Sequence, residues 1–250
     1  MLQQLIDEAP RFYTYWNMIF LAEAAMNTLF VSLFGCAIGY AVGFVIATLR
    51  QSRINPVGPF RWALITYTEA IRRIPFLVLL FCVFFAFQLS GTELSLFVIA
   101  TTAVALRMSA LAAENIRAGY EAINPLQWDA AIAMNMSPIG TLMRVILPQA
   151  WRVILPPSTI HTVSMIKETS LVSQIGFLEL TFAARMLNQR GFSALICFGT
   201  VLILYFVISW SFQKAGRYAE RKLVHEARGK AAVAGTPSTA LAGNTQGAGT

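Results

Sequence analysis

Charged residues are scarce in this chain. Only 12% of its 250 residues are Asp, Glu, Lys or Arg, and 56% are hydrophobic, whereas about a quarter of an ordinary soluble domain is charged. This composition excludes a soluble enzyme or binding domain. The hydrophobic residues occur in long runs over most of the chain, which predicts an integral membrane protein with one membrane domain.

Cysteine and histidine are also rare. The three cysteines lie inside apolar runs (Cys36, Cys82 and Cys197), and the two histidines, His161 and His225, are far apart. There is no disulfide framework and no metal-ligand spacing. The sequence also lacks a G-x-x-x-x-G-K-[ST] phosphate loop and a nucleophile–base pattern. We therefore expect no metal or cofactor in this chain and no enzymatic activity, ATP hydrolysis included.

Long apolar segments are what the sequence has in abundance. A hydrocarbon core about 30 Å thick requires roughly 20 apolar residues of helix. In the first segment Gly35, Gly39 and Gly43 are four residues apart, which predicts close packing of a second helix on that face. Five segments are long enough, which predicts an all-α membrane protein with about five transmembrane helices, at residues 20–49, 62–88, 94–118, 149–174 and 191–213.

The basic residues are distributed unevenly between the two sides of these spans. The positive-inside rule places the side with more Lys and Arg in the cytoplasm. The net charge of +7 is thus a topology marker rather than a sign of nucleic-acid binding. We expect a multi-pass protein of the cytoplasmic (inner) membrane, with its N-terminus outside and its C-terminus in the cytoplasm. The cytoplasmic residues are Arg50, Arg53, Arg61, Arg117, Arg144, Arg152, Lys214, Arg217, Arg221, Lys222, Arg228 and Lys230; Arg11, Arg185 and Arg190 lie opposite.

These assignments divide the chain into three parts. Residues 1–19 are an extracytoplasmic segment, residues 20–222 are the transmembrane domain, and residues 223–250 are a cytoplasmic tail. The transmembrane domain includes a long cytoplasmic loop at residues 119–148. The final twenty residues are small and unpatterned, so we expect the end of the tail to be disordered.

The cytoplasmic loop has two helix-start signals separated by a turn signal. Asn124 followed by Pro125 is typical of a helix start, and Ser137 followed by Pro138 repeats the pattern. Asn135, between them, tolerates the left-handed conformation in which many helices end. The loop is therefore predicted to form a short helix, a sharp turn at Asn135 and a second helix.

The first loop helix is unusually apolar for a cytoplasmic segment. Asp129 is its one charged residue, beside Trp128, Ala130 and Ala131. Such a helix needs a surface to cover it. Packing against its own transmembrane bundle and docking on a partner subunit both fit the pattern.

Several motifs of the chain resemble those of one transporter family. "DAAIAMNMSP" followed by "VILP" resembles the Glu-Ala-Ala loop of ATP-binding-cassette importer permeases. "EAIRRIPFLVLL" (69–80), "AAENIRAG" (112–119) and "KETSLVSQIG" (167–176) resemble segments of its polar amino-acid branch. The resemblance covers residues 20–220. The chain has Asp129 and Asn135 where the loop motif has Glu and Gly, and it lacks the family's Gly-Thr at Arg73 and Ile74.

This resemblance implies the type I importer permease fold and a set of partners. The chain would pair with a second permease, identical or related, and would receive polar amino acids from an extracytoplasmic binding protein. ATP and Mg²⁺ would be bound by two cytoplasmic ATPase subunits. The loop residues implied in docking on those subunits are Trp128, Asp129, Ala130, Ala131, Asn135 and Ser137.

Ionisable residues within the spans are candidates for a substrate pathway, because they are costly in lipid unless they face a cavity or a partner. A zwitterionic amino acid needs an anion for its ammonium and a cation for its carboxylate. Structural ion pairs between helices are the competing interpretation, and His161 also fits a simple packing role. The candidates are Arg107 and Glu114 in the third span and His161, Ser164, Lys167 and Glu168 in the fourth.

Two other functions remain open on the sequence. One is an ion-coupled secondary transporter whose intramembrane carboxylates exchange protons. The other is a purely structural membrane subunit in which Glu114 and Glu168 form packing pairs.

Overall fold

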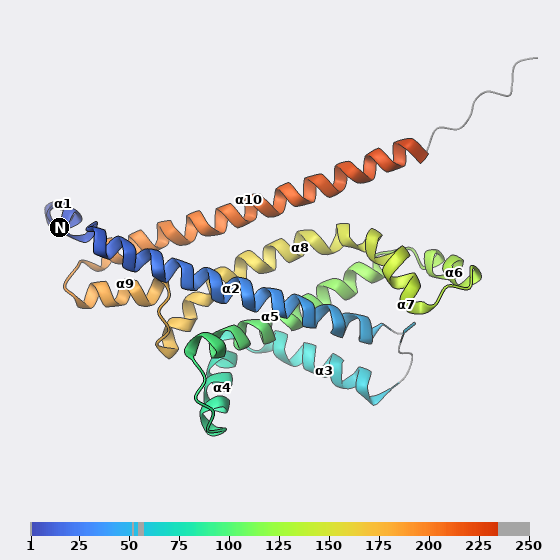
Figure 1. Ribbon diagram of the computed structural model, residues 1–250, viewed down its shortest axis with the longest axis horizontal. Coiled ribbons are helices and arrows are strands. Elements are labelled where there is room, and N and C mark those ends of the chain that lie inside the picture. Colours follow the sequence, from blue (N-terminus) through green and yellow to red (C-terminus); the bar gives the residue numbers. More distant parts are fainter. Residues whose placement is uncertain (1, 52, 55–57, 235–250) are drawn as a thin grey trace, which may run out of the picture.

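The computed structural model describes residues 2–51, 53–54 and 58–234, and these form helices joined by short connections, without a strand (Figure 1). The all-α prediction is therefore confirmed. The helices are α1 (Leu2–Phe12), α2 (Tyr15–Arg50), α3 (Pro59–Arg73), α4 (Phe76–Leu89), α5 (Leu96–Glu121), α6 (Pro125–Ala133), α7 (Pro138–Thr141), α8 (Leu147–Glu168), α9 (Leu180–Gln189) and α10 (Ala194–Ala234). A π-helical segment (Leu142–Ile146) joins α7 to α8, and a 3₁₀ segment (Thr169–Ile175) follows α8.

The central helix pair is α2 with α5, and glycines bring the two backbones together. A Cβ atom added to Gly39 would lie 2.5 Å from the Cβ of Met108. One added to Gly43 would lie 2.6 Å from the Cβ of Ala112 and 2.8 Å from the backbone oxygen of Ser109. This confirms the close packing predicted from the glycine spacing.

Gly43 offers the first test of this packing. The Gly43→Ala substitution should force α2 and α5 apart and lower the free energy of unfolding by about 1–3 kcal/mol, the usual cost of overpacking. Gly199→Ala, on α10, is the matched control, because an added Cβ there meets nothing within 4 Å. Thermal unfolding of the two variants in detergent measures the difference. Equal melting temperatures would contradict the close approach.

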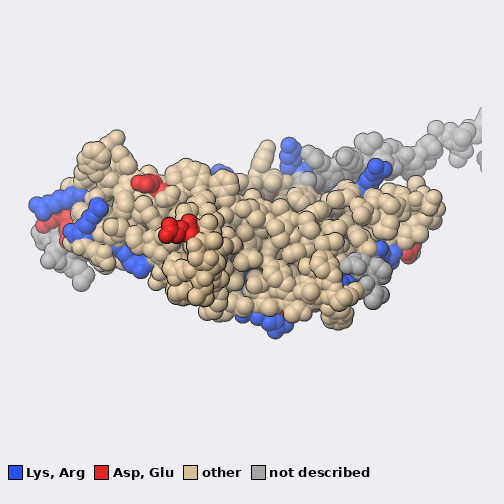
Figure 2. All heavy atoms as spheres, turned by 60° about the horizontal axis from the view of Figure 1, so that its bottom comes forward, with Lys and Arg blue, Asp and Glu red and all other residues tan. Residues whose placement is uncertain are grey.

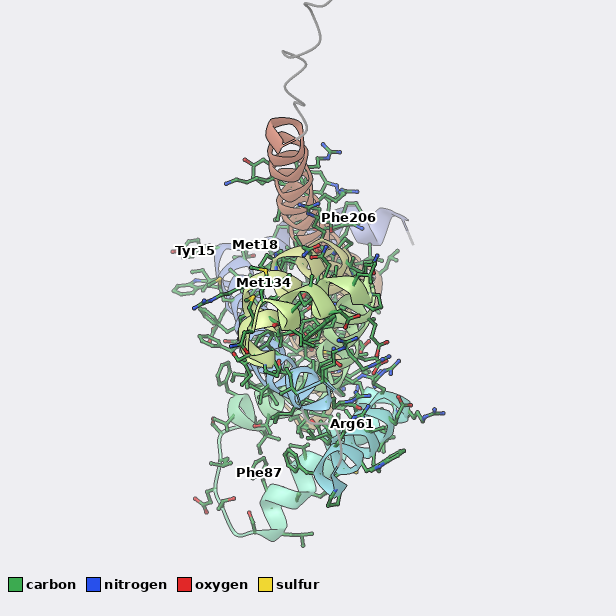
Figure 3. The ribbon with its side chains drawn as sticks, turned by 90° about the vertical axis from the view of Figure 1, so that its right-hand side faces the viewer. Tyr15, Met18, Arg61, Phe87, Met134 and Phe206 are labelled. Atoms are coloured by element: carbon green, nitrogen blue, oxygen red, sulfur yellow. The ribbon has the colours of Figure 1, made fainter. Side chains whose placement is uncertain are left out.

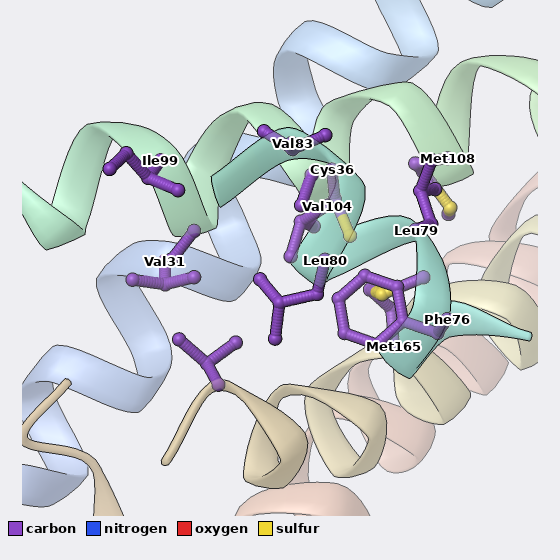
Figure 4. Packing of buried hydrophobic residues seen from close by; sticks show 13 residues of the cluster. Val31, Cys36, Phe76, Leu79, Leu80, Val83, Ile99, Val104, Met108 and Met165 are labelled. Atoms are coloured by element: carbon purple, nitrogen blue, oxygen red, sulfur yellow. The ribbon is translucent and has the colours of Figure 1, made fainter. Parts of the chain in front are cut away.

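The second predicted span, 62–88, is wrong as a single helix. It is divided into α3 and α4, whose axes differ by 114°. Pro75 lies at the break and lacks the N–H that a continuous helix needs, and it disfavours helical geometry at Ile74. α4 then packs into the largest core cluster, where Leu80 lies among Val31 of α2 and Val104 of α5 (Figure 4).

The predicted number of about five spans stays a prediction. Among the described residues, three helices are long and apolar enough to cross a membrane alone: α2, α5 and the Ala194–Lys222 part of α10. The bent α3–α4 pair would be a fourth span. α8 occupies most of the fourth predicted span and is less apolar than these helices, because several of its residues are polar or charged. Figure 2 shows the mostly uncharged surface that such a protein presents.

Both ends of the described chain are helical. Residues 1–19 contain α1 and the start of α2, and Phe12 is fully buried against α9 and α10. α10 continues to Ala234, so residues 223–234 of the predicted tail are helical. The predicted disorder falls largely on residues 235–250, which lie outside the described part of the chain.

Candidate functional site

The helix signals of the loop are satisfied as predicted. The Asn124 side chain accepts a hydrogen bond from the backbone N–H of Leu126 at 2.9 Å, and α6 begins at Pro125. The Ser137 hydroxyl accepts from the backbone N–H of Gly140 at 3.1 Å, and α7 begins at Pro138. These two caps fix where each loop helix starts.

The turn between the two loop helices depends on Asn135. Its φ angle is 58°, and it is the one non-glycine residue with positive φ in the described part of the chain. The backbone N–H of Asn135 donates to the oxygen of Ile132 at 2.8 Å, and that of Met136 donates to the oxygen of Ala131 at 3.0 Å. These are the paired bonds of a Schellman motif, with asparagine in the left-handed position. The predicted turn is confirmed.

α6 has two apolar faces with different surroundings. Trp128 and Ala131 are buried, with 4% and 3% exposure. Trp128 packs in one core cluster with Ile116 and Tyr120 of α5 and Leu142 of the π-helical segment. These two residues therefore contact the chain's own bundle. They are unavailable for the direct docking contact expected of them.

The rest of α6 and its C-cap residue are exposed and include several apolar side chains. Met134 is 76% exposed and Ile132 57%, and Ala130 and Ala133 are exposed beside them. Figure 3 views the molecule from this end and labels Met134. The buried residues of α6 therefore fit packing against the chain's own bundle, and the exposed apolar residues fit docking on a partner. The exposed large apolar residues of the loop up to α7 are Leu126, Ile132, Met134 and Ile139.

An ion pair ties α6 to the α2–α3 connection. A guanidinium nitrogen of Arg53 lies 2.9 Å from a carboxylate oxygen of Asp129. The same guanidinium stands 5.6 Å from the centre of the Trp128 ring. The pair is partly exposed and so contributes only about 0.2–1 kcal/mol. Its main effect is to fix the orientation of α6.

Glu114 lies in a network of arginines at the end of the bundle nearest α6. It is 3.2 Å from Arg50 of α2 and 3.7 Å from Arg72 of α3, and it also pairs with Arg117 on its own helix. Arg50 is almost fully buried and donates a further hydrogen bond to the Thr68 hydroxyl at 2.8 Å. This carboxylate joins three helices, which matches the structural ion-pair interpretation.

Arg107 has a different set of partners from Glu114. One of its guanidinium nitrogens donates to the backbone oxygens of Ile71, Arg72 and Ile74, at 2.8, 3.0 and 3.3 Å. These carbonyls are at the C-terminal end of α3, where helical partners are missing. Arg107 therefore stabilises the α3–α4 break. The structure does not bring Arg107 and Glu114 together as one charge pair.

The α8 candidates lie around the end of that helix. His161 and Ser164 are half-buried, and Lys167 is exposed. One carboxylate oxygen of Glu168 is buried without a hydrogen-bond partner among the described residues. Lys167 lines a cavity of about 670 Å³ between the end of α8 and α10.

Two charged residues with structural roles, Arg50 and Glu179, were not predicted from the sequence. Arg50 was interpreted only as a topology marker, and its pairing with Glu114 joins positions far apart in the chain. Glu179 is 1% exposed, and its carboxylate accepts from the backbone N–H groups of Thr181 and Phe182 and from the Tyr205 hydroxyl. Burial raises the pKa of the Glu179 carboxyl. Glu is not among the usual N-cap residues, so the sequence pattern did not indicate this cap of α9.

The chain is similar in sequence to known membrane transport proteins. Residues 39–221 match the family described as binding-protein-dependent transport system inner membrane component. The L-cystine transport system permease protein of Bacillus subtilis is 34% identical over 84% of this chain and 88% of its own length. The probable glutamine ABC transporter permease protein of the same organism is 29% identical over 83% and 95%.

A solved structure is similar as well. A crystal structure described as an amino acid ABC transporter with histidines superposes with a TM-score of 0.74 at 30% identity. The match covers 82% of this chain and 94% of the other.

Proposed function

The chain belongs to the family of binding-protein-dependent transport system inner membrane components, and from that premise we propose how it works as the permease subunit of an amino-acid ATP-binding-cassette importer. The amino acid passes from an extracytoplasmic binding protein, through this chain and a second permease, into the cytoplasm. Two cytoplasmic ATPase subunits bind ATP and Mg²⁺ and drive the cycle. The observation that carries this proposal is the exposed apolar face of α6.

The α6 face is the proposed contact with an ATPase subunit. Ile132, Met134 and the exposed alanines form an apolar surface that a groove on a partner would cover. Asn135 and Ser137 shape the loop through the turn and the second cap. Trp128 and Ala131 act from the other side, because they anchor the helix in the bundle.

The anchor explains how movement of α6 would reach the spans. Trp128 packs in one cluster with Ile116 and Tyr120 of α5, and α5 packs closely along α2. Asp129 adds the link to Arg53 in the α2–α3 connection. A displacement of α6 by the ATPase is therefore transmitted to packed helices rather than absorbed by a mobile loop.

The proposed substrate pathway concentrates on the end of α8. Lys167 and Glu168 have charged groups without a described ion-pair partner there, and His161 and Ser164 lie on the same helix toward the cytoplasmic side. Arg107 and Glu114 are proposed to lie beside the substrate pathway. Their present contacts give both residues a role in holding α3 and α5.

Transport assays in proteoliposomes test the energy source. The complex is purified through a tag on this chain and reconstituted, and labelled L-glutamine and L-cystine are supplied with a binding protein. Uptake should require hydrolysable ATP on the α6 side and should not follow an imposed proton or sodium gradient. Uptake driven by a gradient without ATP would establish the secondary-transporter alternative. Absence of uptake under every condition, with an intact complex, would favour the structural-subunit alternative.

A further inference from the structure

One exposed face of α10 changes from apolar to basic along the helix. Only 11% of the most apolar part of α10 is buried, against 61% for α5, so α10 lies at the edge of the bundle. The basic end of this face lies at the end of the molecule that carries α6 (Figure 1), which is the predicted cytoplasmic end. The residues of the face follow at intervals of three and four; they are Phe206, Val207, Trp210, Lys214, Arg217 and Arg221, and all are exposed.

The basic residues of this face have no carboxylate partner among the described residues. Lys214, Arg217 and Arg221 form no ion pair there, whereas each arginine around Glu114 has a carboxylate oxygen within 3.7 Å. The Lys214 ammonium instead lies 5.0 Å from the centre of the Trp210 ring. Seven residues of helix separate Lys214 from Arg221, which is about 10 Å. These three cations, the α10 basic stripe, are therefore close together and lack a neutralising charge.

The position of the stripe favours a lipid headgroup as its partner. Trp210 directly precedes the stripe, and Trp is enriched where the hydrocarbon core meets the headgroups. Phe206 and Val207 continue the same face into the span as exposed apolar surface, which suits acyl chains. A second copy of this chain that docked symmetrically through the same face would bring the cations against one another. Clusters of Lys and Arg directly beyond a span are typical of binding to anionic lipids.

We propose that this face of α10 binds an anionic phospholipid. Its phosphate is held by Lys214, Arg217 and Arg221, and an acyl chain runs along Phe206, Val207 and Trp210. The headgroup neutralises the basic stripe and fixes the depth at which α10 enters the bilayer. This lipid site is separate from the proposed substrate pathway and does not depend on what the chain transports.

Photocrosslinking of lipid to the purified complex tests the site. The complex is placed in phosphatidylcholine nanodiscs with a trace of phosphatidylglycerol, or of phosphatidylcholine, that carries a photoreactive acyl chain. Crosslinks on α10 are quantified by mass spectrometry, and phosphatidylglycerol should give the higher yield. The double variant Arg217→Gln with Arg221→Gln should lower the ratio of the two yields about 30-fold, because each basic residue near an anionic surface contributes about 1 kcal/mol.

Two further double variants separate the site from a general effect of charge. Arg217→Lys with Arg221→Lys keeps both charges and should keep most of the ratio. Arg144→Gln with Arg152→Gln is the matched control, because it removes two exposed arginines of the same end of the molecule that lie outside α10. This control should leave the ratio on α10 unchanged.

Four results would overturn the lipid site. Equal yields for the two lipids on α10 of the unaltered complex, or an unchanged ratio in the Arg217→Gln and Arg221→Gln variant, would exclude it directly. An equal fall in the matched control would reduce the preference to overall charge. Loss of the ATPase subunits from the Arg217→Gln and Arg221→Gln variant with the ratio unchanged would identify this face as a protein contact.

Discussion

Met134→Glu should separate the permease from its ATPase subunits while the permease stays folded. Met134 is the C-cap residue of α6 and is 76% exposed, so the change removes few internal contacts. A carboxylate placed in an apolar docking surface is poorly solvated there, and disrupting a central interface residue typically costs 2 kcal/mol or more, which is about 30-fold in affinity. Co-purification of the ATPase subunits and ATP-driven uptake should both fall.

Two comparison variants make this result specific. Leu89→Glu places the same charge on a residue that is 90% exposed at the C-terminal end of α4, and it should leave the complex intact. Ala131→Arg should act differently again, because Ala131 is 3% exposed and faces the bundle. That variant should lower the melting temperature of the permease itself. Unchanged ATPase co-purification in Met134→Glu would refute docking through this face.

The sequence predicted those loop features that depend on neighbouring residues. The caps at Asn124 and Ser137 and the left-handed turn at Asn135 each follow from a side chain and the backbone a few residues away. Which face of α6 is buried could not be predicted in this way. Trp128 is buried because α5 and the π-helical segment surround it, and that arrangement is set by tertiary packing.

The error in the second span has a similar origin. The strongly apolar residues of α4 raised the average hydropathy over residues 62–88, although α3 carries several charged residues, and this average concealed the break that Pro75 itself indicated. Arg107 and Glu114 share a face of α5 by their spacing of seven, yet their partners come from other helices. Arg107 binds backbone oxygens at the end of α3, and Glu114 binds Arg50. Spacing along one helix says which face a charge is on but not what lies opposite.

The strongest stability effect is expected at Glu114. Glu114→Gln removes the negative charge that holds Arg50, Arg72 and Arg117 together. Arg50 has a side chain only 7% exposed, and leaving a buried charge unpaired costs about 3–5 kcal/mol. The three like charges would also repel one another. We expect a fall in the free energy of unfolding at the lower end of that range, because Glu114 itself retains 21% exposure.

Glu121→Gln is the matched control for this substitution, since Glu121 pairs with the same Arg117 but is 58% exposed. Its cost should stay below about 1 kcal/mol, as for other surface pairs. The double variant Arg50→Met with Glu114→Gln should regain part of the lost stability, because it removes the orphaned buried cation along with its partner. Unfolding in detergent measures all three variants. If Glu114→Gln were as stable as Glu121→Gln but altered the preference among amino acids, Glu114 would contact the substrate. A loss of stability with an unchanged preference would mean that Glu114 holds α2, α3 and α5 together.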